Sequence, residues 1–108
     1  MPLFIKTEKF KYKTLELSNS ERKIFLLMHK KWVEDIRQSG NYIHSGYLIN
    51  EKKIPGGGGL LILEAKDYLS AQKVIEKDPM ITNNLVTWEL QEWIPINGSK
   101  PQFPNHLG

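Results

Sequence analysis

One long helix, with both ends marked in the sequence, is the feature that most constrains how this chain can fold. Ser18 and Glu21 stand at the spacing of a capping box, in which the hydroxyl and the carboxylate each satisfy a backbone N–H group at the start of a helix. Gly40 follows Arg37 closely and supplies the left-handed stop that favours a residue without a Cβ atom. The sequence therefore predicts a helix between Ser18 and Gly40.

The predicted helix is amphipathic, and one polar residue interrupts its apolar side. At about 100° per residue, the apolar side chains that fall on one broad arc are Ile24, Phe25, Met28, Trp32, Val33 and Ile36. This arc is expected to face a core. His29 projects within the same arc, where packing alone would favour an aliphatic residue. It is either a core-edge histidine bonded to a backbone carbonyl or a functional residue.

Four strands and a second, shorter helix complete the expected order. The further elements are a strand over Leu3–Glu8 with an irregular continuation to Tyr12, a strand over Tyr42–Ile49, a strand over Leu60–Leu63, a helix opening at Lys66-Asp67 and ending at Asp78-Pro79, and a strand over Leu85–Ile94. Asn50–Gly59 contains four consecutive glycines and is expected to be a flexible connection. It is not predicted to bind phosphate, because a strand follows it rather than a Lys-Ser/Thr pair and a helix.

The order of these elements predicts the fold. Strand, helix, strand, strand, helix, strand is the split βαβ arrangement of ferredoxin-like folds, an α+β class with a four-stranded antiparallel sheet and two helices on one face. Leu60–Leu63 is apolar on both faces of its strand, so the second face of the sheet also needs cover. A second copy of the same sheet is the most economical cover, and we expect a homodimer. One domain is expected over residues 1–96, followed by an irregular tail over residues 97–108.

Composition and charge narrow the class of protein. The chain has no cysteine, which excludes disulfides and thiolate catalysis and fits a reducing cytoplasm. No extended apolar run is present, so neither a membrane span nor a signal sequence is predicted. The net charge of +3 comes from lysines interspersed with carboxylates, so nucleic acid is not an expected partner. Lys9, Lys11 and Lys13 alternate with Phe10 and Tyr12, which we interpret as a lysine-protected edge strand.

Several segments together resemble one known family. They are the helix residue His29, the strand end Ser45-Gly46-Tyr47-Leu48, the Gly-rich segment leading into Gly59–Ala65, the helix around Ala71, and Lys77-Asp78-Pro79-Met80. Over roughly residues 2–96 the chain is similar to the YCII-related (YciI-like) domain family. The resemblance implies a dimeric α+β barrel with a pocket between helices and sheet, where His29 and Asp78 approach each other as a catalytic pair. It also implies a relation to muconolactone isomerases and to dehalogenases of chlorinated lactones.

A histidine paired with an aspartate suits proton abstraction or elimination on a small molecule. An imidazole accepts or donates a proton near neutral pH, and a carboxylate on one ring nitrogen fixes the tautomer and stabilises the imidazolium. We therefore predict His29 and Asp78 as catalytic residues; the alternative for Asp78 is a solvated residue at the helix exit, held there by Pro79. The residues predicted to bind substrate are Trp32, Ser45, Gly46 and Tyr47.

Other kinds of site have less support in the sequence. Ser45 lacks the sharp Gly-x-Ser-x-Gly turn that exposes a serine nucleophile. His29, His44 and His106 lack the short spacing of a metal site, and no metal or other cofactor is expected. The alternative to an enzyme is a non-catalytic module that binds a small ligand or a protein. An RNA-recognition domain is disfavoured, because Leu60–Leu63 stands where exposed aromatic residues would be needed.

Overall fold

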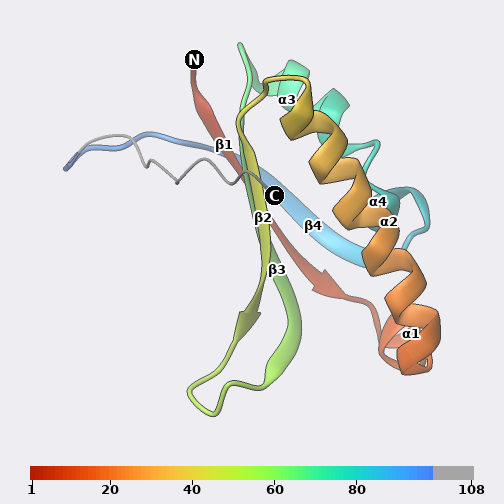
Figure 1. Ribbon diagram of the computed structural model, residues 1–108. Helices are drawn as coiled ribbons and strands as arrows, with labels where there is room; N and C mark the ends of the chain where they lie inside the picture. The colour runs from red at the N-terminus through yellow and green to blue at the C-terminus, as the bar shows by residue number, and fades with distance from the viewer. Residues whose placement is uncertain (99–108) are drawn as a thin grey trace.

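The computed structural model describes residues 1–98 and contains one antiparallel sheet covered on one face by helices (Figure 1). In chain order the elements are β1 (Leu3–Phe10), α1 (Tyr12–Leu15), α2 (Asn19–Gln38), β2 (Ile43–Ile49), β3 (Pro55–Glu64), α3 (Tyr68–Ile75), α4 (Pro79–Thr82) and β4 (Val86–Trp93). The strand order across the sheet is β2-β3-β1-β4, and every neighbouring pair is antiparallel. The predicted ferredoxin-like α+β fold is confirmed. Most of the predicted tail, residues 99–108, lies outside the described residues.

Helix α2 begins and ends as its capping residues predict. The Ser18 hydroxyl accepts from the Glu21 backbone N–H at 3.1 Å, and the Glu21 carboxylate accepts from the Ser18 N–H at 3.1 Å. At the other end, the Gly40 N–H donates to the Arg37 carbonyl at 3.0 Å. Gly40 has φ +92°, a conformation that side chains with a Cβ atom rarely adopt. These local bonds fix the length of the helix that carries His29.

Part of the predicted apolar arc of α2 does not face the core. Val33 is buried, and Trp32 and Ile36 pack against the main core. Ile24 and Met28, in contrast, are 60% and 45% exposed. The prediction is wrong for these two residues because α2 turns the side that carries His29 and Val33 toward the sheet. At about 100° per residue, Ile24 and Met28 lie well around the helix from that side. The main core lies farther along, between the sheet and the helices.

The predicted Gly-rich connection is wrong. Strand β3 begins at Pro55, so the four glycines belong to it, and Gly59 pairs with Tyr47 on one side and Glu8 on the other. A Cβ atom on Gly59 would lie 3.2 Å from the Gly46 carbonyl oxygen and 3.3 Å from Glu8 Cγ. Glycine therefore lets three strands approach closely here, and the actual connection is the short turn over residues 50–54.

The interpretation of the lysines near residue 10 as edge protection is also wrong. Strand β1 lies between β3 and β4, so it is central in the sheet rather than at an edge. The chain leaves the sheet after Phe10 and forms the single turn α1. Thr14 in this turn is buried and donates its hydroxyl to the Leu85 carbonyl at 2.6 Å, which fixes α1 beside the start of β4.

Candidate active site

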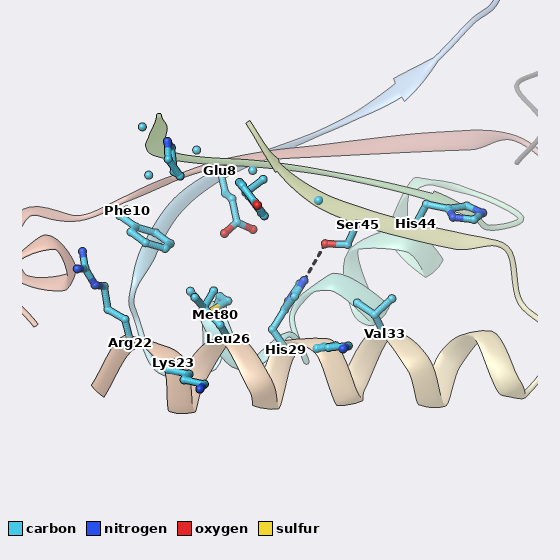
Figure 2. Close-up of a pocket in the computed structure, with 18 of the residues that line it drawn as sticks. Glu8, Phe10, Arg22, Lys23, Leu26, His29, Val33, His44, Ser45 and Met80 are labelled. Atoms are coloured by element: carbon cyan, nitrogen blue, oxygen red, sulfur yellow. Dashed lines mark hydrogen bonds between the residues drawn. The ribbon is translucent and has the colours of Figure 1, made fainter. Parts of the chain in front are cut away.

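His29 lies on α2 with its ring pointing at the sheet, and both ring nitrogens have a side-chain partner. Nδ1 is 2.8 Å from Asp78 Oδ1, and Nε2 is 2.8 Å from Ser45 Oγ. Figure 2 shows the ring rising from the helix toward Ser45 on strand β2. The structure thus brings together three residues that the sequence analysis had singled out. The side chain of His29 is 15% exposed, so one edge of the ring remains open.

Asp78 is fully buried and lies directly before α4, whose first residue is Pro79. Its Oδ1 atom accepts from the Met80 backbone N–H at 2.9 Å as well as bonding to His29, and its Oδ2 atom accepts from Lys6 Nζ at 2.7 Å. Asp78 does cap a helix, but it is not solvated. The short helix α4 was not predicted, because its four residues are too few for a periodic pattern.

The surroundings of Asp78 fix its charge. Burial raises the pKa of the Asp78 carboxyl, but the hydrogen bond with His29 and the positive charge of Lys6 outweigh this effect, so the pKa lies below its ordinary value. Asp78 is therefore ionised near neutral pH and can only accept hydrogen bonds. It follows that His29 donates through Nδ1, and that Nε2 of the neutral ring accepts from the Ser45 hydroxyl.

Two charged residues of β1, Lys6 and Glu8, belong to the same cluster and were missed in the sequence. Lys6 is fully buried and donates to both Asp78 and Glu8. A signal was available, because side chains alternate along a strand and Lys6 therefore faces the same side as the core residue Phe4. A lysine at an inward position of a strand needs a buried anionic partner.

A cavity of about 1090 Å³ opens between α2 and the sheet, and His29 lies on its wall. Ser45, Gly46 and Tyr47, which the sequence analysis proposes as substrate-binding residues, line it, and so does Glu8. Trp32 does not line it. The Trp32 ring lies 5.8 Å from the His29 ring, centroid to centroid, and packs against the main core, so it supports His29 from the core side.

The cavity wall carries more positive than negative side chains. The charged residues that line it are Glu8, Arg22, Lys23, Lys30, Glu34 and Arg37. All but Glu8 come from α2, so the helix side of the cavity is basic. This balance favours small anions over small cations.

Ser45, His29 and Asp78 have the contacts of a nucleophilic triad. Ser45, however, lies in the middle of β2, where it pairs with Leu61, and not on a sharp turn between a strand and a helix. We therefore interpret Ser45 as the hydrogen-bond partner of His29 Nε2 rather than as a nucleophile.

Residues 1–98 contain no cluster of metal ligands and no helix suited to crossing a membrane. In this part of the chain no three His, Asp or Glu side chains group as metal ligands would. No helix there combines the length and apolar character needed to cross a membrane.

Comparisons with known proteins support the fold. No family model and no curated protein matches the sequence. A solved 5-chloro-2-hydroxyhydroquinone dehydrochlorinase (TftG) from Burkholderia phenoliruptrix, in complex with 2,5-dihydroxybenzoquinone, has a TM-score of 0.63 and 19% identity, over 85% of this chain and 93% of that one. A dimeric ferredoxin-like protein from an uncultured marine organism has a TM-score of 0.52 and 16% identity, over 92% and 100%. At such identities these similarities establish the ferredoxin-like fold alone.

Proposed function

We propose that this protein is an enzyme that moves protons on a small, anionic organic molecule, with His29 and Asp78 as its acid–base pair. The observation that carries the proposal is the hydrogen-bonded chain from Ser45 through His29 to Asp78, one end of which opens on the cavity. Asp78 is ionised and fully buried, so it orients the ring and leaves Nε2 as the basic atom toward the cavity.

The chemistry follows from this arrangement. Nε2 of His29 takes a proton from a carbon or hydroxyl of the substrate, and the ionised Asp78 stabilises the imidazolium that forms. The electron pair left on the substrate can form an enolate, or it can expel a leaving group such as chloride. The imidazolium then returns its proton to another substrate atom or to solvent. Ser45 and the glycines of β3 leave room for the substrate beside the ring.

Two resemblances support this choice. Membership of the YCII-related (YciI-like) family, which pairs a histidine with an aspartate, is part of the proposal and rests on the segments around His29 and Asp78. The fold is shared with a dehydrochlorinase solved with 2,5-dihydroxybenzoquinone. A lactone-like or halogenated substrate fits both.

Deuterium exchange tests the proposal without knowledge of the natural substrate. In D2O, 2,5-dihydroxybenzoquinone and a panel of small lactones would be incubated with the protein, and loss of their C–H signals followed by proton NMR. We expect faster exchange with the parent protein and a loss of about 100-fold in His29→Gln, the usual contribution of a general base. The control is Asp35→Asn, a substitution on the exposed side of α2, which should exchange like the parent.

The alternative is a binding module without catalysis. It predicts that a probe binds in the cavity, seen as shifts of backbone NMR signals of Ser45, Gly46 and Tyr47, while its exchange rate stays at the uncatalysed value. That result would overturn the enzyme proposal and favour the alternative.

The proposal includes a cytoplasmic homodimer formed through the open face of the sheet. On this face, opposite the helices, Ile5 pairs with Ile62, and Leu48 and Trp93 are 54% and 36% exposed. Contiguous apolar residues on an uncovered sheet indicate a protein interface. Light scattering should report twice 12.5 kDa for the parent chain, and Ile62→Lys should shift the mass toward the monomer. A parent protein that scatters as a monomer would contradict the homodimer.

A further inference from the structure

The charged cluster behind the cavity extends beyond His29 and Asp78. Lys6 is fully buried between the carboxylates of Asp78 and Glu8 and donates to both. Burying a lysine is costly unless its charge is compensated, and here two anions surround one cation. The role of Glu8 in this cluster is not explained by support of Lys6 alone, because Asp78 already pairs with it.

The charges of the cluster do not sum to zero. With neutral His29, the cluster holds one cation and two carboxylates and so carries one excess negative charge. A proton on His29 or on Glu8 cancels this excess. Asp78 does not take it, because its pKa is held below the ordinary value.

Both of these groups reach the cavity, whereas the residues that connect them do not. His29 and Glu8 line the cavity, and the Glu8 side chain is 10% exposed. Figure 2 shows the Glu8 carboxylate pointing from β1 into the space between the sheet and α2, on the same side as the His29 ring. Within residues 1–98, Lys6 bonds to the Oε1 atom of Glu8 rather than to Oε2.

We infer that Glu8 is a second catalytic residue of this site, linked to His29 by the ion pairs of Lys6 and Asp78, and that the substrate class is a small molecule that loses a proton at one atom and gains one at another. This inference rests on the proposed function. It narrows that function to tautomerisation of an enolisable or hydroxylated substrate.

The step is balanced in atoms and charges. A C–H or O–H bond of the substrate breaks, its proton goes to the Glu8 carboxylate, and its electron pair stays on the substrate. The Nε2–H bond of protonated His29 then breaks, and its proton forms a new bond at the second substrate atom. The cluster again holds one proton, now on Glu8, and exchange with solvent returns it to His29. Starting with the proton on Glu8 runs the reaction in the opposite direction.

Other charged or titratable side chains line the same cavity. They are Arg22, Lys23, Lys30, Glu34 and Arg37 from α2 and His44 and Tyr47 from β2. Lys6 lies behind Glu8 and does not line the cavity. The variants below leave all of the α2 and β2 groups unchanged.

The experiment is a titration of the His29 ring by NMR in the full chain, which needs no substrate. In Glu8→Gln an anion of the cluster is lost, so the titration midpoint of His29 should move to lower pH. In Lys6→Met a cation is lost, so the midpoint should move to higher pH. The matched control is Glu76→Gln, at an exposed position that ends α3, and its curve should match the parent.

Superimposed curves for Glu8→Gln and the parent would overturn the inference. Lys6→Met leaves Asp78 buried without its cation and can fail to fold, in which case Glu8→Gln decides alone because Gln keeps an acceptor for Lys6. In the exchange assay, Glu8→Gln should lose about 100-fold while Glu76→Gln keeps the parent rate. Full exchange in Glu8→Gln together with loss in His29→Gln would overturn the role of Glu8 and leave the proposed function standing.

Discussion

The layer between the sheet and the helices has two halves that are equally buried and chemically opposite. Phe4 and Lys6 are two residues apart on β1, face the same side, and are both fully buried. Phe4 belongs to an apolar core with Leu61 and Ile75, whereas Lys6 joins the charged cluster. In residues 1–98 no buried side-chain N or O atom lacks a hydrogen-bond partner. Burial alone therefore does not distinguish the apolar core from the site. The two regions differ in that the site contains paired charges.

Helix α2 repeats this division along its length. Its second half packs Val33 and Ile36 on the apolar core. Its first half contributes no residue to that core, and Ile24 there is 60% exposed. The cavity runs along both halves. One half of the layer stabilises the fold, and the other holds a site whose residues are available for chemistry.

The largest effect should come from the apolar half. Phe4→Ala removes a fully buried aromatic ring and should lower the free energy of unfolding by about 3–5 kcal/mol. Urea unfolding followed by circular dichroism measures this. A loss below about 1 kcal/mol would contradict the claim that the apolar half is the source of stability.

A smaller loss of stability is expected in the charged half. Asp78→Asn keeps an acceptor for the Met80 N–H but leaves Lys6 with only Glu8 as an anionic partner. The free energy of unfolding should fall by about 2 kcal/mol, the cost of a buried group left with poorer hydrogen bonding. Asp35→Asn, the same change in an exposed i,i+4 pair, should cost about 0.5 kcal/mol or less. Equal losses for the two variants would show that the cluster is not tightly paired.

The pH dependence of stability should sharpen the same contrast. The pKa of Asp78 is lowered in the folded state, so the folded protein binds fewer protons than the unfolded chain. The stabilisation is present above the unfolded value of about 3.9 and is lost as pH falls through the folded pKa. Unfolding from about pH 5 downward should therefore depend less on pH in Asp78→Asn than in the parent. Parallel curves would contradict this account.

The smallest effect should come from Ser45. Ser45→Ala removes one hydrogen bond to His29 Nε2, which is worth about 1 kcal/mol, or roughly fivefold in rate. The exchange assay measures this against His29→Gln. A loss as large as that in His29→Gln would mean that Ser45 reacts covalently, and our interpretation of it would be wrong.

The sequence predicts the fold well where local rules decide it. The capping box at Ser18 and the glycine at position 40 set the bounds of α2, and the order of elements leads to the ferredoxin-like sheet. The sequence also singles out His29, as a polar residue within an apolar arc, and Asp78, which Pro79 holds before α4.

What the sequence missed depends on contacts between distant segments. Gly56–Gly59 reads as a flexible connection, and only the pairing of β3 with β1 and β2 makes a strand of it. Lys6 and Asp78 are 72 residues apart, so no spacing rule connects them. Ile24 and Met28 share the apolar pattern of core residues, and they are exposed because α2 packs with another side toward the sheet.

The central claim is that His29 and Asp78 act as one proton-binding unit, and NMR titration of His29 in the parent and in Asp78→Asn tests it most directly. Loss of the carboxylate bonded to Nδ1 should move the His29 titration midpoint to lower pH by about one unit, equivalent to about 1.4 kcal/mol. Asp35→Asn, which removes a carboxylate from the exposed side of α2, should leave the curve in place. If the curves of the parent and Asp78→Asn coincide, the two residues are not coupled, and His29 is a core-edge histidine.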